Sequence, residues 1–315
     1  MALALLTKGV VNSFSRRLNI IPKPANTPFS FTIAKLSKER KLISERGSAQ
    51  SFTLDLGNDV TIEMVEIPEG EFTIGSPEGE KSRGGDERQT PRLVETFYMS
   101  RTPVTQAQWQ KVAQLPQVKR PLLEIPSTFV TLTNNSVNPV AMIPNAPVET
   151  VSWEEAREFC DRLTRIFAGT YRLPKEDEWE YACRAGTTTP FFCGETITPE
   201  VANYDCNFSY LEGQERQPED YKGETIWVNQ IQTSNGFGLQ GMAGNVWEWC
   251  ENVYESNYLK SFNTQANAND TSPQSRTIRG GSWSSFPQDC RSAKRKAQLQ
   301  TVRTNTVGFR IAFNE

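Results

Sequence analysis

The chain has 315 residues, enough for one large domain or two small ones. Charged residues make up 23% of it and the formal net charge is -3, so no overall basic field favours a nucleic-acid partner. Histidine is absent, which excludes Ser-His-Asp and Cys-His nucleophile systems and any imidazole metal site. Acid/base chemistry near neutral pH would therefore fall to carboxylates, lysine, tyrosine or cysteine.

Residues 1–50 are expected to form a leader or a flexible N-terminal segment. The opening stretch MALALLTKGVVNSFSRRL is amphipathic and basic, and no acidic residue precedes Glu39. Its apolar run is too short for a signal peptide or a membrane span. The segment is either a loosely ordered leader or a contact with a membrane surface or a partner. Without an export signal or a transmembrane segment, the sequence predicts a cytoplasmic protein.

A better specified region begins near Ser51. Alternating apolar residues predict two strands joined as a hairpin at residues 57–59, followed by a strand, a turn and a second strand over residues 64–76. Thr105 is expected to cap a helix over residues 106–115, with Trp109 and Val112 facing a core.

Two further helices are predicted in the middle of the chain. Ser152 and Glu155 form a capping-box pattern, and apolar residues then recur every three or four positions to Ile166. Pro174 is expected to open a third helix over residues 175–184. From Gly186 onward, dense turn signals indicate loops and short strands. The fold class is therefore α+β, irregular and loop-rich.

The cysteines are too far apart in sequence for a zinc knuckle. No two of them form a CxxC pair, and their even number permits disulfides. Cys160 lies on an amphipathic helix pattern, however, and this favours buried free thiols. The six are Cys160, Cys183, Cys193, Cys206, Cys250 and Cys290.

The segment from Arg279 to Arg310 has well-defined ends but no internal period. RGGSW opens it and VGFR closes it, and between them small, polar, basic and apolar residues are mixed. An active-site loop, a plain surface loop and a surface kept variable would each explain this pattern.

Seven segments together resemble the sulfatase-modifying-factor, or formylglycine-generating-enzyme, superfamily. The resemblance covers about residues 51–315 and implies a single domain with a variant of the C-type lectin fold. The segments are IPEGEFTIGS (67–76), YMSRTPVTQAQW (98–109), PVETVSWEEAREFCDRL (147–163), YRLPKEDEWEYACRAGT (171–187), NGFGLQGMAGNVWEWCEN (235–252), RGGSW (279–283) and VGFRIAF (307–313).

Two activities of this superfamily fit the chain poorly. Formylglycine-generating enzymes bind copper through a cysteine pair shortly after the GGS-aromatic motif, but residues 281–287 contain no cysteine and Cys290 lies outside that pair. One thiolate cannot make the two-sulfur site that Cu(I) prefers, so no copper is expected. The related ergothioneine sulfoxide synthases build their iron site from histidines, which this chain lacks.

A third resemblance is to the variable proteins of diversity-generating retroelements, whose C-terminal segment keeps a fixed frame around randomised positions. The frame residues present here are Gly280, Gly281, Ser282, Trp283, Pro287, Cys290, Arg291, Ser292, Ala293, Arg295, Arg303, Val307, Gly308, Phe309 and Arg310. The residues at the variable positions are Ser284, Ser285, Phe286, Gln288, Asp289, Lys294, Lys296, Ala297, Gln298, Leu299, Gln300, Val302, Thr304, Asn305 and Thr306.

This resemblance implies a non-catalytic protein that binds a protein or a small ligand through a diversified surface at about residues 283–306, within the variable region 279–310. Lysine and glutamine at variable positions depart from the pattern, because asparagine codons mutated at adenine do not produce them. The alternative is a family member whose loop has drifted, or a sulfatase-modifying-factor-type enzyme with an unusual oxidase or modifying site.

The resemblance also implies structural calcium held by loop oxygens. One site would use the side chains of Asn203 and Asp220 with the carbonyls of Tyr204 and Lys222. A second would use Gly244, Val246 and Glu248, but its leading ligand position is Gly241, which has no side chain. Glu248 would otherwise accept hydrogen bonds from loop N–H groups without a metal.

Overall fold

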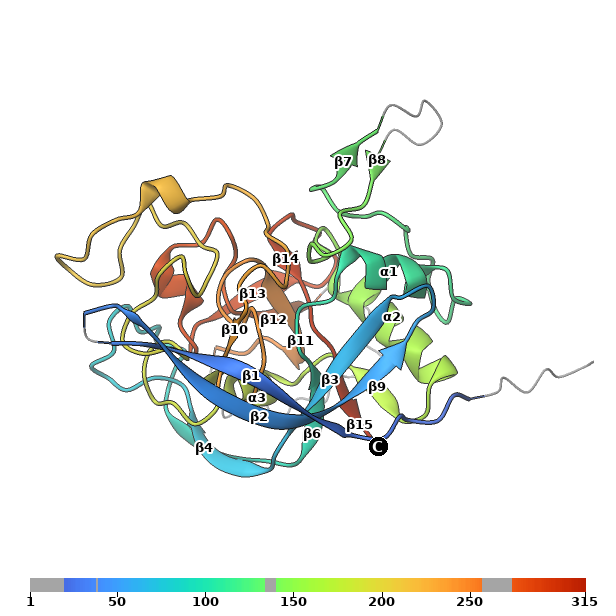
Figure 1. The fold of residues 1–315 in the computed structure, drawn as a ribbon, viewed down its shortest axis with the longest axis horizontal. Coiled ribbons are helices and arrows are strands. Elements are labelled where there is room, and N and C mark those ends of the chain that lie inside the picture. Colours follow the sequence, from blue (N-terminus) through green and yellow to red (C-terminus); the bar gives the residue numbers. More distant parts are fainter. Residues whose placement is uncertain (1–19, 38, 134–139, 257–273) are drawn as a thin grey trace, which may run out of the picture.

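The computed structural model describes residues 20–37, 39–133, 140–256 and 274–315. Its larger sheet has the strand order β10-β1-β2-β3-β6-β15-β9 (Figure 1). Only β10 runs parallel to its neighbour; the other pairings are antiparallel. The strands are β1 (Thr27–Leu36), β2 (Leu42–Asp55), β3 (Thr61–Ile67), β6 (Phe97–Ser100), β9 (Thr170–Arg172), β10 (Thr233–Ser234) and β15 (Ala312–Asn314).

The second sheet is built almost wholly from the C-terminal part of the chain. Its order is β13-β12-β11-β14, formed by β11 (Trp247–Val253), β12 (Ser275–Arg279), β13 (Arg295–Leu299) and β14 (Val307–Gly308). Two small antiparallel pairs stand apart: β4 (Gly70–Ile74) with β5 (Thr90–Val94), and β7 (Thr131–Leu132) with β8 (Val140–Ala141). Short 3-10 turns lie at Pro218–Asp220 and Pro287–Cys290.

Three α-helices are present in the described ranges: α1 (Gln106–Ala113), α2 (Trp153–Ile166) and α3 (Glu176–Arg184). The predicted caps at Thr105 and Ser152 are confirmed, each as a reciprocal capping box. The third helix is confirmed with a shifted start, because Lys175 is its N-cap and Pro174 precedes the cap. Local side-chain-to-backbone hydrogen bonds decide these starts, which is why the sequence places them closely.

The predicted hairpin at residues 57–59 is confirmed: Leu54 of β2 faces Ile62 of β3, and Gly57, Asn58 and Asp59 all have positive φ. The two strands predicted over residues 64–76 are present as β3 and β4. They do not pair with each other, because β4 pairs with β5. The free edge of β3 is taken by β6.

The predicted leader boundary at residue 51 is wrong for residues 27–50. They form β1 and most of β2, a long antiparallel ribbon that crosses the lower half of the view in Figure 1. Phe31 and Ala34 of β1 are buried, so this ribbon is part of the core. Most of its other side chains are partly or fully exposed, and therefore its sequence shows little apolar periodicity. Residues 1–19 lie outside the described residues.

The core is rich in aromatic side chains and confirms the irregular α+β class. One cluster gathers around α2 and contains Trp109, stacked on Phe159 at a centroid distance of 5.7 Å, and Phe309, whose ring edge meets Phe159 at 5.2 Å. A second cluster surrounds Trp179 of α3. All six cysteines are free and buried. No helix in the described ranges is long and apolar enough to span a membrane.

Candidate functional site

The candidate site is the segment 279–310, which enters through the end of β12 and returns through β13 and β14 (orange and red in Figure 1). Two backbone hydrogen bonds tie it to the loop before α2: Thr150 N donates to Thr304 O at 2.9 Å, and Trp153 N donates to Gln300 O at 3.0 Å. The segment therefore lies over the start of α2 and supplies strands β13 and β14 of the second sheet.

Burial separates the two sets of residues in this segment. The frame residues are buried, with two exceptions, Trp283 and Arg303. Every residue at a variable position is partly or fully exposed except Ser285, which is 8% exposed. Ser285 Oγ accepts a hydrogen bond from the Ser282 N–H at 3.0 Å, so this side chain closes the turn after the GGS motif. Substitutions at the other variable positions would change the surface and leave the core intact.

Arg291 anchors the middle of the segment to the loop 80–87. Its guanidinium is fully buried and donates to both oxygens of Glu87 at 2.8 Å and to Glu80. A further bond goes to the carbonyl of Ser82 at 2.7 Å. Burial alone would lower the pKa of Arg291, but the hydrogen bonds and charges of Glu87 and Glu80 outweigh burial and hold it above its usual range. The segment is thus fixed through a buried cluster of three charged groups, Arg291 with Glu80 and Glu87.

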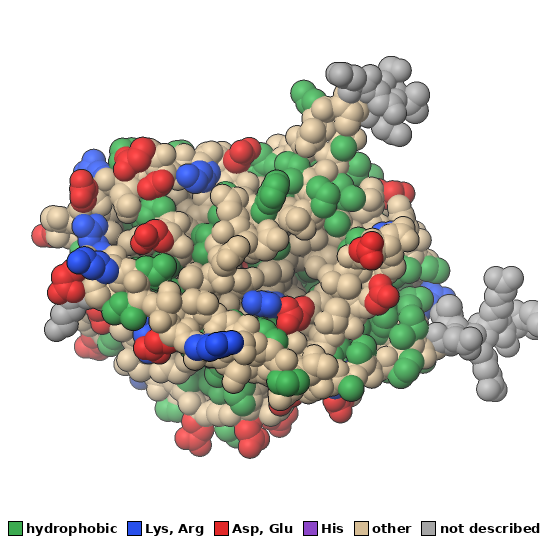
Figure 2. Space-filling view, viewed as in Figure 1, with side chains coloured by type: hydrophobic (Ala, Val, Ile, Leu, Met, Phe, Trp, Pro, Cys, Tyr) green, Lys and Arg blue, Asp and Glu red, His purple; other side chains and the backbone are tan. Residues whose placement is uncertain are grey.

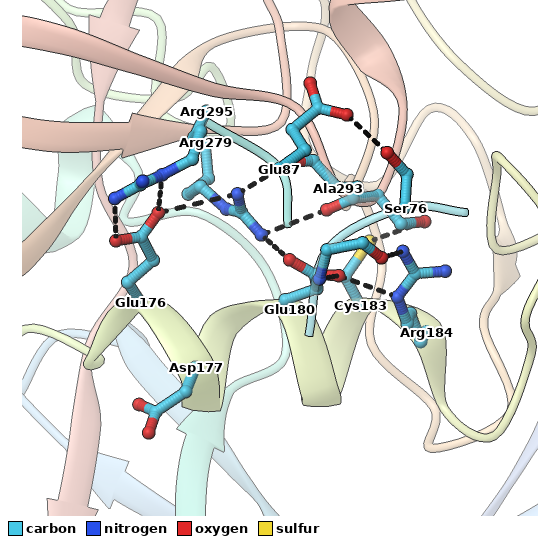
Figure 3. Close-up of polar contacts among 12 residues, drawn as sticks. Ser76, Glu87, Glu176, Asp177, Glu180, Cys183, Arg184, Arg279, Ala293 and Arg295 are labelled. Atoms are coloured by element: carbon cyan, nitrogen blue, oxygen red, sulfur yellow. Dashed lines mark hydrogen bonds and ion pairs between the residues drawn. The ribbon is translucent and has the colours of Figure 1, made fainter. Parts of the chain in front are cut away.

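Arg279 and Arg295 anchor the segment to one face of α3 (Figure 3). Arg295 donates to the two oxygens of Glu176 at 2.7 and 2.8 Å, and Arg279 contacts Glu180 and the carbonyl of Ala293. Asp177 points away from this cluster in Figure 3. A planar guanidinium with five donors can hold a carboxylate and several carbonyls at once, and this use explains why arginine occupies these positions.

Glu248 is held in the same way and is therefore a poor calcium ligand. Arg310 donates to its two oxygens at 2.7 and 2.9 Å, and Trp179 Nε1 donates to Oε2 at 2.6 Å. Gly244 N donates to Gly280 O, and Val246 N donates to Gly244 O. The second implied calcium site does not fit this geometry, because Arg310 already supplies the positive charge.

The four residues of the first implied calcium site lie around one hollow. Asn203, Tyr204, Asp220 and Lys222 line one hollow of about 370 Å³. Asn203 Nδ2 donates to Glu224 O and to Asn245 Oδ1, so its Oδ1 stays available as an acceptor. The exposed Lys222 ammonium lies 3.8 Å from Asp220 Oδ1, where a bound cation would have to displace it. The donor set consists of oxygens, as a hard cation requires. No cluster of three or more Cys, Asp or Glu side chains suitable for a metal occurs among the described residues.

The stretch after the GGS motif, where the resemblance implies the copper cysteines, forms a serine turn. Ser282 Oγ lies 3.3 Å from Ser284 Oγ and 3.0 Å from Ser285 Oγ. Cys290 is buried behind this turn, and burial raises the pKa of its thiol well above the usual range. A neutral, buried thiol is neither a nucleophile nor a ready metal ligand.

Sequence reasoning missed Glu149, a buried carboxylate beside the segment. Its oxygens accept hydrogen bonds from Phe129 N at 3.0 Å and from Thr150 Oγ1 at 2.5 Å, and no arginine or lysine pairs with it in the described residues. Burial raises its pKa. Thr150 has φ +60°, a strained value for a β-branched residue, and the Phe129 ring meets the Trp283 ring edge-on at 5.6 Å. Glu149 thus fixes the neighbour of Trp283.

A family model described as the sulfatase-modifying factor enzyme 1-like domain matches residues 56–315. The mouse formylglycine-generating enzyme is 27% identical over 286 residues, covering 79% of this chain and 74% of its own. A bovine protein described as inactive C-alpha-formylglycine-generating enzyme 2 is 26% identical, covering 82% and 90%. A serine/threonine-protein kinase pkn1 of Chlamydia caviae is 27% identical, but this chain spans only 38% of its length.

Two solved structures share the fold. PvdO from Pseudomonas aeruginosa superposes with a TM-score of 0.63 at 24% identity, covering 84% of this chain and 98% of its own. Treponema denticola variable protein 1 superposes with a TM-score of 0.61 at 21% identity, covering 84% and 99%. At these identities the similarity concerns the fold.

Replacing Arg291 by methionine should lower the free energy of unfolding by roughly 3–5 kcal/mol, because Glu80 and Glu87 would stay buried without their partner. The matched control is Gln288→Ala at a variable position in the same turn, which should change stability by less than about 0.5 kcal/mol. Denaturant unfolding of both variants measures the difference. Equal effects of the two changes would contradict the division into frame and surface.

Glu149→Gln should remove the free-energy cost of burying an ionised carboxylate, a cost that depends on pH. Because the folded-state pKa of Glu149 is raised, the folded protein disfavours the carboxylate, and stability should fall as pH rises from near 4.5 through the folded pKa. The variant should therefore be at least as stable as the native chain at pH 7, with the gain shrinking toward pH 4.5. Thermal unfolding across this range tests it, with Glu95→Gln as the exposed control. A gain that grows on acidification would contradict the assignment.

Proposed function

Since the chain belongs to the sulfatase-modifying-factor family, we propose that it is a non-catalytic ligand-binding protein whose surface at about residues 283–306 is diversified by a retroelement. The ligand is a protein or a small molecule bound at this surface. One observation carries the proposal: the frame residues of the segment are buried and the variable positions are exposed, apart from the three residues named above.

The anchoring contacts give this separation a physical basis. Arg279, Arg291, Arg295 and Arg310 are each held by glutamates outside the segment, so the backbone course of 279–310 does not depend on the exposed side chains. Exposed substitutions usually change stability by less than about 0.5 kcal/mol. Antibody paratopes divide a rigid frame from adaptable contacts in the same manner. The segment can therefore change its ligand without losing its fold.

The rival proposal, an oxidase or modifying enzyme, has less support. The chain has no histidine, the copper-cysteine position holds Ser282, Ser284 and Ser285, and Cys290 is a buried thiol. The matched relatives include one that is itself described as inactive. Turnover of a cysteine-containing sulfatase peptide in the presence of Cu(I) would favour the rival.

Calcium at the first site belongs to this proposal as a structural element. The side-chain oxygens of Asn203 and Asp220 with the carbonyls of Tyr204 and Lys222 would hold it. The ion would supply a positive charge that orders the loop between these residues. Glu248 takes no part, because Arg310 already neutralises it.

DNA sequencing of the gene's 3′ flank tests the diversification. We expect a near copy of the codons for residues 279–310 beside a reverse-transcriptase gene, differing from the gene almost only where the copy carries adenine. The differences should fall on codons of exposed residues and spare those of Arg291, Arg295 and Arg310. A flank without such a copy would return the chain to a drifted member of its family.

Added calcium should raise the melting temperature of the native chain by mass action, since the proposed site would exist only in the folded state. Asp220→Asn should abolish this increase, because it removes the site's only carboxylate among the four residues. Glu219→Gln changes a neighbouring exposed acid and should leave the increase intact. Scanning calorimetry with and without calcium measures the melting temperature of each variant. If calcium still raises the melting temperature of Asp220→Asn, the ion binds elsewhere.

A further inference from the structure

Two exposed phenylalanine rings meet at the edge of the candidate surface. Phe286, at a variable position, is 41% exposed, and Phe208 is 44% exposed. Their ring centroids are 4.4 Å apart and the rings are inclined at 61°. Two large apolar side chains that touch each other and stay half exposed form a small contiguous apolar patch, which is a candidate contact for a ligand.

Phe208 comes from a loop outside the segment, and that loop is held rigidly against it. Asp205 N donates to Ser285 O at 2.9 Å, which joins the two backbones next to the ring pair. Asp205 Oδ1 accepts from Asn207 N at 3.2 Å and from Asn207 Nδ2 at 2.8 Å, closing the turn before Phe208. Buried tyrosines at 204 and 210 flank the turn. Phe208 is therefore presented at a fixed place and loses little freedom on binding.

The two rings differ in one respect that matters for recognition. Phe286 occupies a variable position, whereas Phe208 lies far outside residues 279–310. A diversified segment would replace Phe286 from variant to variant, but every variant would still present Phe208 at the same place. The surface thus combines a changing part with a constant aromatic contact.

We propose that Phe208 is a constant anchor of the ligand surface and that it receives an apolar side chain of a polypeptide ligand. The inference rests on the proposed function, because it concerns the same surface, but it needs only binding and not diversification. Phe208 and Phe286 carry no conventional hydrogen-bonding group, so an apolar side chain is the contact that best covers the two rings.

The surroundings favour a polypeptide over a charged polymer or a membrane. Asp289 and Lys294 form an ion pair at 3.3 Å and cancel each other's charge, and Gln288 and Ser284 are neutral. On the face of the molecule drawn in Figure 2, acidic and basic side chains are interspersed over the upper part, and acidic ones gather along the lower edge. The Asp205 carboxylate beside Phe208 is occupied by hydrogen bonds from Asn207. An apolar contact surrounded by polar side chains whose charges are paired or hydrogen-bonded matches the anatomy of protein interfaces.

The test uses the full chain as bait for a phage-displayed library of random peptides. Selection is run in parallel on the native chain and on Phe286→Ser. Peptides enriched on both baits should share an aromatic or large aliphatic residue. They should bind Phe208→Ala at least about tenfold more weakly than the native chain, a loss typical of an interface hot spot. Phe208→Leu keeps an apolar contact and should retain most of the binding.

Leu93→Ala is the matched control, because Leu93 is exposed and apolar but lies on β5. It should leave peptide binding within about twofold of native, and thermal unfolding should confirm that each variant is folded. Peptides that bind Phe208→Ala as well as the native chain would overturn the inference. So would enrichment on the native chain no greater than on the double variant Phe208→Ala/Phe286→Ala. If the 3′ flank holds no near copy of the codons for residues 279–310, the proposed diversification is contradicted, but the binding result for Phe208 is unaffected.

Discussion

The buried arginine–glutamate pairs between the C-terminal segment and the rest of the domain are the interaction on which this structure depends. Arg279, Arg291 and Arg310 have no exposed surface, and each is matched by a glutamate from α3, from the loop 80–87 or from β11. Such pairs add little net stability, because desolvation offsets the attraction. Their consequence is geometric: an unpaired buried charge is so costly that only one course of the segment is tolerated.

This constraint lets a region with few regular elements present a defined surface. Loops whose hydrogen bonds were made by their own exposed side chains would rearrange whenever those side chains changed. Here buried side chains hold the carbonyls of the segment. The guanidinium of Arg279, for example, donates to the carbonyls of Ser292 and Ala293. The anchoring contacts and the exposed side chains belong to different residues of one short stretch, so under the proposed function the exposed residues can differ without loss of the fold.

The edges of the surface come from elsewhere in the chain. Phe208 meets Phe286 on one edge, and Phe129, fixed by buried Glu149, meets Trp283 on another. Binding specificity would therefore be a joint property of the segment and two distant loops. At Glu248 the resemblance implied a calcium ligand, but the structure shows an ion pair with Arg310. The guanidinium neutralises the carboxylate, as a bound cation would have done.

The sequence by itself determined the features that depend on near neighbours: the caps at Thr105 and Ser152 and the turn at 57–59. The tertiary structure alone decided that residues 27–50 belong to the large sheet, because that ribbon shows few buried side chains of its own. It also decided the partners of Glu248, Glu149 and Phe208. Their contacts join residues far apart in the chain, and no local pattern records which distant backbone or side chain will satisfy a buried charge or cover an exposed ring.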